Sequence, residues 1–215
     1  MAIRAARVRF GRRASSGWCM LMSGTSPART ALARARSLIG SGRYLAGAGG
    51  RDPHASTPDS IVRGRRGCDN AGFLAWCFGY DRYQRGFAFG WDWINADSMI
   101  VEAETLKAWF RPLPEPEIGA IVAYSSIDLE RDGHRDRVGH AGLVVAVPAR
   151  WSSDDHAWAA MRIIHCSRSI QRRRGHAIDE THAIAWAHRA SCRGASNPCW
   201  RTRFLRYVHS VPQRS

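Results

Sequence analysis

The fold is decided by the stretch Gly67-Cys-Asp-Asn-Ala-Gly-Phe-Leu-Ala-Trp-Cys-Phe78. Gly67 permits a tight turn, and Asp69 belongs to the residue types that favour the N-cap of a helix. From Phe73 onward the side chains are almost all apolar, which predicts a buried helix. The start of that helix is where chemistry is expected, because unpaired N–H groups and the positive end of the helix dipole lie there. The same pattern is also that of an ordinary capped core helix.

Two later stretches predict strands that each carry a histidine. Residues 138–147 form a β-branched run with His140 near its start, and residues 162–167 form a shorter run that contains His165. If the two strands are neighbours, their imidazoles lie side by side, and one can take a proton while the other orients it. The alternative is a pair of unrelated, half-buried histidines.

Together the three stretches resemble the NlpC-type family of bacterial cell-wall cysteine peptidases. In that family a helix begins Asp-Cys-Ser-Gly-Phe with the cysteine as nucleophile, a Gly-His-small-Gly strand supplies the base, and a polar residue on the next strand orients the base. The resemblance covers about residues 30–208 and implies that His140 is the base and His165 the orienting residue. It also matches Tyr44 to a tyrosine whose hydroxyl lies beside the active site.

The resemblance implies a papain-like α+β domain, in which helices pack on a central antiparallel sheet. It further implies that the partner is peptidoglycan or a cell-wall peptide, and that the family's substrates are stem peptides cut between a D-amino acid and a following residue such as diaminopimelate. We place Asp69, Ala71 and Ser167 among the positions that contact substrate.

The departure from the family motif falls on the nucleophile. Matching Asp69 and Phe73 to the motif puts Asn70 at the cysteine position and Ala71 at the serine position. An amide cannot attack a carbonyl, so the site is expected to form no acyl-enzyme. Cys68 is the alternative nucleophile, but it is expected to precede the helix cap, with its side chain directed elsewhere.

Three functions stay open at this point. In the first, the chain keeps the fold and binds cell-wall peptide or a protein partner without turnover. In the second, it is a working hydrolase or amidase that uses Cys68 or an unrecognised nucleophile. The third function is that of a polyanion-binding protein that acts through its basic N-terminal arm and through Arg172, Arg173 and Arg174.

Composition favours a single domain. The 215 residues are 45% hydrophobic and include nine tryptophans, which is enough for one substantial core. We predict a basic disordered arm at 1–26, one domain at 27–210 and a tail at 211–215. The formal net charge of +14 predicts non-specific attraction to polyanions, whereas no motif for specific nucleic-acid binding is present.

Neither a membrane span nor a secretory signal is predicted. No apolar run is long enough to cross a bilayer, and the segment Trp18–Met22 is too short for a secretory signal peptide. We therefore expect the chain to be cytoplasmic or to reach the cell envelope by a non-classical route.

No cofactor or metal is predicted. The glycines at 47, 49 and 50 lack the flanking strand and helix of a dinucleotide site, and the cysteines at 19, 68, 77, 166, 192 and 199 lack zinc-ligand spacing. A weak calcium loop is the exception, with acidic side chains at alternating positions. Its candidate ligands are Asp128, Glu130, Asp132 and Asp136. Gly139 stands where a bidentate glutamate is needed, which favours a solvated hairpin loop.

The remaining elements follow from periodicity and breakers. Helices are predicted at 27–39, 92–110 and 178–188, a polar loop at 52–66, and a solvated basic turn at 172–174. Strands are predicted at 118–124 and at 202–208, the latter as a closing strand.

Overall fold

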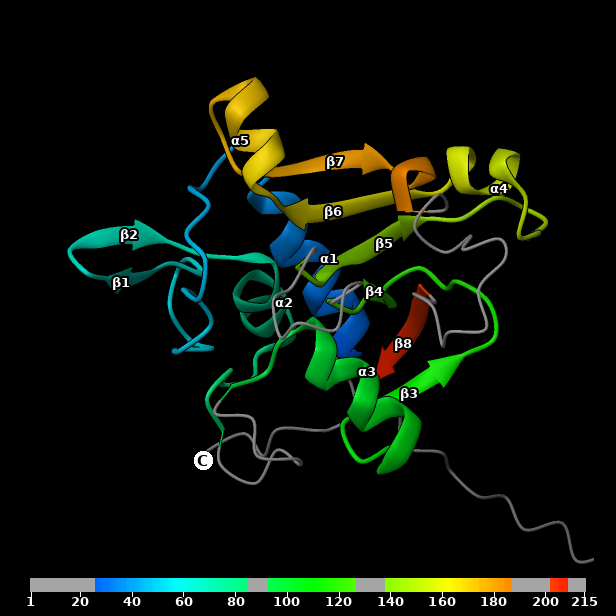
Figure 1. The fold of residues 1–215 in the computed structure, drawn as a ribbon, viewed down its shortest axis with the longest axis horizontal. Coiled ribbons are helices and arrows are strands. Elements are labelled where there is room, and N and C mark those ends of the chain that lie inside the picture. The colour runs from blue at the N-terminus through cyan, green and yellow to red at the C-terminus, as the bar shows by residue number, and fades with distance from the viewer. Residues whose placement is uncertain (1–25, 85–92, 127–137, 187–201, 209–215) are drawn as a thin grey trace, which may run out of the picture.

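A computed structural model describes residues 26–84, 93–126, 138–186 and 202–208. In these residues the chain is an α+β protein, in which helices pack on an antiparallel sheet (Figure 1). The predicted α+β class and antiparallel sheet are therefore confirmed.

The main sheet has six strands in the order β3-β8-β4-β5-β6-β7, and every neighbouring pair is antiparallel. Its strands are β3 Phe110–Leu113, β4 Ile121–Tyr124, β5 His140–Ala146, β6 Arg162–Cys166, β7 Ile178–His182 and β8 Arg203–Tyr207. A separate hairpin, β1 Ser60–Val62 and β2 Arg65–Gly67, extends from the body of the molecule (Figure 1). Pro112 is tolerated in β3 because that strand lies at the edge of the sheet.

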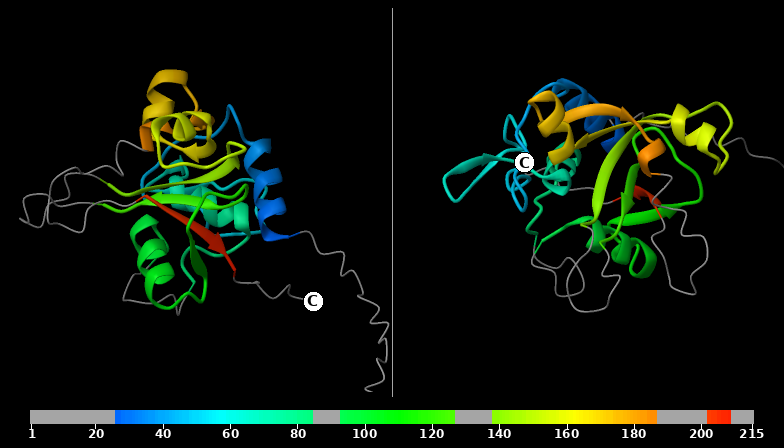
Figure 2. Two further views of the ribbon diagram at one scale, coloured as in Figure 1. Left: turned by 90° about the vertical axis from the view of Figure 1, so that its right-hand side faces the viewer. Right: turned by 45° about the horizontal axis from the view of Figure 1, so that its top comes forward.

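Five helices are described, and Figure 2 shows them around the sheet in two further views. They are α1 Pro27–Ser37, α2 Asn70–Phe78, α3 Ala96–Thr105, α4 Asp155–Ala160 and α5 Arg168–Arg174. The first three share a hydrophobic core with one set of alternating strand residues, including Ala141 and Leu143. The opposite set, including Val122 and Val144, packs with Trp158 of α4. This alternation follows from the pleat of the strands.

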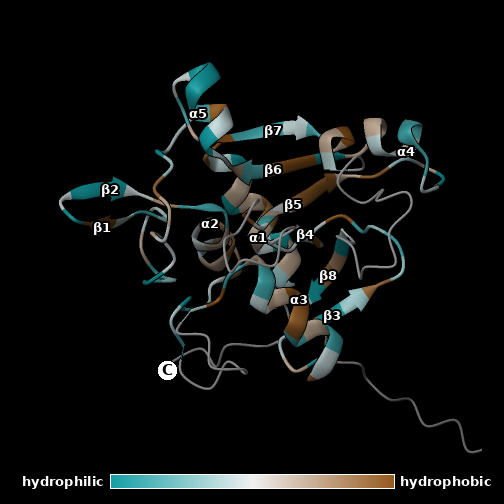
Figure 3. Cartoon of the chain, in the orientation of Figure 1, coloured by the Kyte–Doolittle hydropathy of each residue, from teal (hydrophilic) through white to brown (hydrophobic). Residues whose placement is uncertain are grey.

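The central helix α2 is buried along its whole length, as predicted. Asp69 is its N-cap, and Gly79, in the left-handed conformation, ends it. Gly72 allows the helix to lie directly on a neighbouring loop, because a Cβ at this position would sit 2.4 Å from the carbonyl oxygen of Ala48. The apolar residues of β5 and β6 appear in brown in Figure 3, whereas α5 and β2 are mainly hydrophilic.

The prediction of a helix at 178–188 is wrong for residues 178–182. Residues 178–182 form β7, which pairs with β6 in a continuous antiparallel register. Within β7, Asp179 and Glu180 form ion pairs with Arg174 and Arg162. Tertiary pairing overrides the local signal here.

Other boundaries also differ from the predictions. The polar loop at 52–66 contains most of the β1–β2 hairpin, and the basic turn at 172–174 is the last turn of α5. The predicted helix at 92–110 is confined to α3, and β8 lies between β3 and β4 rather than closing the sheet. The helix predicted at 27–39 and the strands at 118–124, 138–147 and 162–167 are present with shorter bounds.

Several predictions fall outside the described residues. These are the basic arm except its last residue, the tail, the calcium-loop candidates Asp128, Glu130, Asp132 and Asp136, and the cysteines at 19, 192 and 199. Within the described ranges, no helix is both long enough and apolar enough to cross a membrane. The same ranges contain no group of three or more side chains that is arranged to hold a metal ion.

Candidate functional site

The site begins at the first residue of α2. Asn70 follows the N-cap Asp69 and is buried, and its Nδ2 lies 2.9 Å from Nδ1 of His140. His140 is the first residue of β5, on the strand that packs most closely against α2. The helix start and the sheet therefore meet at one hydrogen bond between these two side chains.

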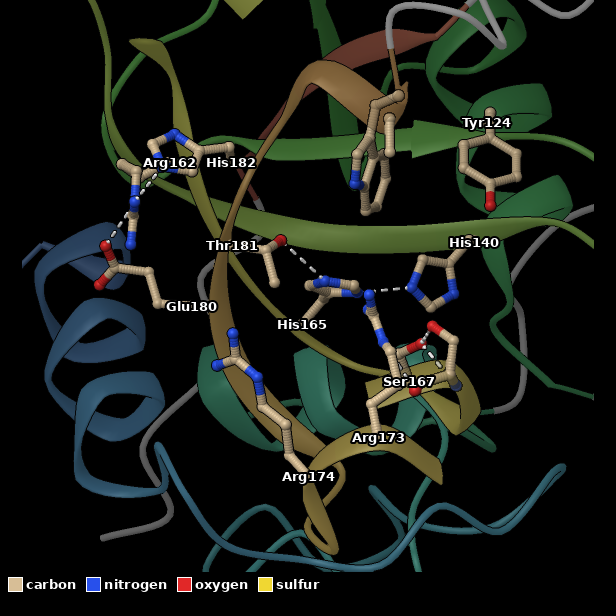
Figure 4. Close-up of a pocket in the computed structure, with 13 residues that line it drawn as sticks. Tyr124, His140, Arg162, His165, Ser167, Arg173, Arg174, Glu180, Thr181 and His182 are labelled. Carbon is tan, nitrogen blue, oxygen red and sulfur yellow. Dashed lines mark hydrogen bonds and ion pairs between the residues drawn. The ribbon is translucent and has the colours of Figure 1, made fainter. Parts of the chain in front are cut away.

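A line of hydrogen bonds continues from His140 across the sheet (Figure 4). Nε2 of His140 lies 2.8 Å from Nδ1 of His165 on β6, and Nε2 of His165 lies 3.0 Å from Oγ1 of Thr181 on β7. We call the four residues Asn70, His140, His165 and Thr181 the relay. The sequence predicted the first three members, but it missed Thr181 because that residue lies in the segment predicted as a helix.

The hydrogen bonds of the relay are consistent with two neutral histidines. If the Asn70 amide donates to Nδ1 of His140, then Nε2 of His140 donates to Nδ1 of His165, and Nε2 of His165 donates to Oγ1 of Thr181. Each imidazole then carries a single proton, at Nε2. The pKa of His165 is lowered to about 4, chiefly by burial; the Asp179 charge opposes this shift, and the Arg173 charge contributes to it. His165 is therefore neutral at neutral pH.

Asp69 holds the start of α2 in place. Its Oδ1 accepts from the Gly72 N–H at 2.9 Å, and its Oδ2 accepts from the Gly47 N–H at 2.8 Å. The buried guanidinium of Arg82 binds both oxygens, at 2.8 and 2.9 Å, and lies 4.1 Å from the ring centroid of Trp93. Asp69, which we predicted to contact substrate, thus has both carboxylate oxygens engaged within the protein. Nothing in the sequence alone marked Arg82 as their partner.

Cys68 is fully buried and faces away from the relay histidines. Its Sγ lies 3.6 Å from Sγ of Cys166, whose thiol is also 3.3 Å from the Cys68 carbonyl oxygen. The hydrogen bond to Cys166, together with burial, raises the pKa of the Cys68 thiol well above its usual value. The thiolate that attack on a carbonyl requires is therefore disfavoured. Ala71, which follows Asn70 in α2 and was predicted to contact substrate, is buried in the core.

Tyr44 lies between Cys68 and α5. Its backbone N–H donates to Oε1 of Gln171, and the Arg168 guanidinium lies 5.3 Å from the centroid of its ring. Burial, followed by the charge of Asp69, raises the pKa of the Tyr44 hydroxyl to about 12. The hydroxyl is therefore a hydrogen-bond donor at neutral pH and not a phenolate base.

A pocket of about 590 Å³ opens beside the relay. Its wall combines the two relay histidines and Thr181 with other side chains from β4, β6, β7 and α5 and from the residues beside these elements. The lining residues are Tyr124, His140, Arg162, His165, Ser167, Ser169, Arg173, Arg174, Glu180, Thr181, His182, Ala185 and Trp186. Ser167, predicted to contact substrate, thus lies at the pocket. Trp186 packs against both imidazoles, at centroid distances of 5.2 and 5.6 Å.

Comparison with protein-family profiles, curated proteins and solved structures finds no match for the chain. The functional interpretation therefore rests on the residues and geometry described above. Chemically, the arrangement offers two hydrogen-bonded imidazoles beside a polar pocket, and an amide side chain that is not a nucleophile at the start of the buried helix.

Proposed function

We propose that the chain has a papain-like fold of the NlpC type and binds cell-wall peptide beside the relay without cleaving it. One observation carries the proposal: the side chain of Asn70 makes a 2.9 Å hydrogen bond to Nδ1 of His140 at the start of a buried helix. That is the relation a nucleophile has to its general base. The order of the relay, from helix start through two strand histidines, also follows the family pattern quoted from the sequence.

The absence of turnover follows from the chemistry of Asn70. Its amide nitrogen shares its lone pair with the carbonyl group, so removal of a proton by His140 would not generate a competent nucleophile. The nearby thiol of Cys68 is turned toward Cys166 in the core. Since misplacement of a reacting group by even about 1 Å lowers the rate strongly, Cys68 does not replace it.

Peptidoglycan digestion tests this proposal. Purified peptidoglycan is incubated with the unmodified chain and with the double variant Asn70→Cys, Ala71→Ser, and new peptide termini are identified by mass spectrometry. We expect termini from the double variant only. Addition of His140→Ala to the double variant is the control, because it removes the base while keeping the new thiol.

The other outcomes are equally informative. Cleavage by the unmodified chain would show that the assignment of Asn70 is wrong and would make Cys68 the leading nucleophile. Absence of cleavage by both proteins would contradict the cell-wall peptide interpretation. Binding of the unmodified chain to insoluble peptidoglycan in a sedimentation assay measures the retained binding function separately from turnover.

Polyanion binding is the second candidate function. The observation that favours it is the exposed basic surface of α5, in which Arg172, Arg173 and Arg174 form the last turn. This surface would be attracted to anionic polymers by charge alone. Binding that falls steeply as salt is raised and is unchanged in a His140→Ala variant separates it from peptide binding at the relay.

A further inference from the structure

The pocket beside the relay has one arginine whose charge is not balanced by a neighbouring acid. Nε of Arg162 lies 2.9 Å from Oε1 of Glu180, and Arg174 forms an ion pair with Asp179. Arg173 forms no ion pair within the described residues; its Nε donates to the carbonyl oxygen of Ser169 at 3.3 Å. Its terminal nitrogens are available to a ligand.

The position of Arg173 directs this charge toward the relay. Figure 4 shows its side chain extending from α5 toward His165, across the pocket that both residues line. The Arg173 charge is also among the causes that lower the pKa of His165, after burial. An anion bound to Arg173 would therefore lie beside the histidines and not on the outer surface of α5.

A pair of serines supplies a second donor at the start of the same helix. The hydroxyl oxygens of Ser167 and Ser169 lie 2.8 Å apart, and the backbone N–H of Ser169 donates to Oγ of Ser167 at 3.2 Å. Whichever hydroxyl donates within the pair, the hydrogen of the other is left over for a ligand. The pocket thus offers a guanidinium and a hydroxyl as donors to one anion.

We propose that this pocket is a carboxylate-binding subsite, in which Arg173 and the Ser167–Ser169 pair hold a free carboxylate of a peptide ligand next to the relay. The inference rests on the proposed peptide-binding function and names the group that is recognised. A monoanion fits better than a phosphate dianion, because Glu180 also lines the pocket and the other two arginines are already neutralised. Planar carboxylates match the fork of a guanidinium.

The test compares an acid with its amide. N-acetyl-D-alanine and N-acetyl-D-alanine amide are titrated into the full chain at low ionic strength, and histidine-ring NMR shifts report binding beside the relay. We expect the acid to bind roughly tenfold more tightly than the amide, the effect of one charge-assisted hydrogen bond. Arg173→Gln should abolish the difference. Arg172→Gln, the matched control, removes the same charge from a neighbouring exposed residue outside the pocket and should preserve it.

Three results would overturn the inference. They are equal binding of acid and amide, equal losses in the Arg172→Gln and Arg173→Gln variants, and tighter binding of inorganic phosphate than of the acid. Circular dichroism and thermal unfolding verify that both variants are folded. The peptidoglycan experiment is independent of this one. If Arg173 discriminates the acid from the amide but the Asn70→Cys, Ala71→Ser variant does not cleave peptidoglycan, the carboxylate site stands and the proposed NlpC-type function is contradicted. If the variant cleaves but acid and amide bind equally, the proposed function stands and the carboxylate site is contradicted.

Discussion

At the residue scale, His165 links the relay to the stability of the protein. Burial lowers its pKa from 6.5 to about 4, so between these pH values the unfolded chain binds more protons than the folded chain. Its contribution to the free energy of unfolding is therefore complete above about pH 6.5 and is lost as the pH falls toward 4. The loss amounts to roughly 3 kcal/mol. Urea unfolding measured across this pH range checks the expectation.

The contribution of His165 is isolated by substitution. His165→Gln keeps a hydrogen-bonding side chain but cannot titrate, so it should flatten the pH dependence in that window. His156→Gln, at an exposed position in α4, serves as the control and should leave the slope unchanged. A slope that is the same in both variants would contradict the assignment to His165.

Cys68 gives a second prediction at this scale. Since its thiol is fully buried against Cys166 and its pKa is raised, a thiol-reactive probe should not label it in the native protein at mildly acidic pH. Labelling should follow unfolding in denaturant. Peptide mapping by mass spectrometry locates the label, and Cys68→Ser identifies its signal. Rapid native labelling of Cys68 would instead favour the hydrolase that uses this thiol.

At the scale of elements, Glu102 joins the end of α3 to the start of β3. Its Oε1 accepts from the backbone N–H groups of Ala108 and Trp109 at 2.7 and 2.8 Å, and its Oε2 accepts from that of Phe110 at 2.8 Å. Glu102 is fully buried, so these donors have no water to replace it. The carboxylate thereby fixes the turn that places β3 beside β8.

Substitution of this carboxylate should destabilise the protein. Glu102→Gln turns an NH₂ group toward at least one of the donors, and we expect a loss of about 2 kcal/mol in the free energy of unfolding. Glu104→Gln is the matched control in the same helix; its ion pair with Arg203 is exposed, so the loss should stay below about 1 kcal/mol. Chemical denaturation compares the two. Equal losses in the free energy of unfolding for the two variants would show that the three N–H contacts of Glu102 stabilise the protein no more than the exposed ion pair of Glu104.

The elements also explain where prediction from sequence succeeded. The helix α2 was predictable because its cap, apolar run and glycine stop lie within one short stretch. The strand β7 was not, because the pairing of residues 178–182 with β6 depends on a segment about sixteen residues away in the chain. As a result, Thr181 and the pocket wall around it were missed, although His140 and His165 were correctly expected on neighbouring strands.

At the scale of the whole molecule, the net charge of +14 predicts electrostatic binding to polyanions. Retention on immobilised heparin should fall steeply as salt is raised, and a variant with Arg172, Arg173 and Arg174 changed to Gln should elute at lower salt. His140→Ala should elute with the unmodified chain, because that residue contributes to the relay and not to the basic surface. Retention that is insensitive to salt would contradict an electrostatic origin.

The sequence by itself determined the buried central helix, the two histidine strands and the presence of an asparagine, Asn70, directly after the Asp69 helix cap. These features depend on local spacing, on capping and on residue type, all of which can be read within a few residues. It also indicated that Cys68 would precede the helix cap, as the structure places it.

Only the tertiary structure decided how these parts meet. It brought Asn70 within 2.9 Å of His140, extended the line of hydrogen bonds to Thr181, and engaged Asp69 with the buried Arg82. It also left the charge of Arg173 facing the pocket. The contacts of Asn70, His140, Thr181 and Asp69 join residues that are far apart in the chain, and they form because a polar group buried without a partner is costly.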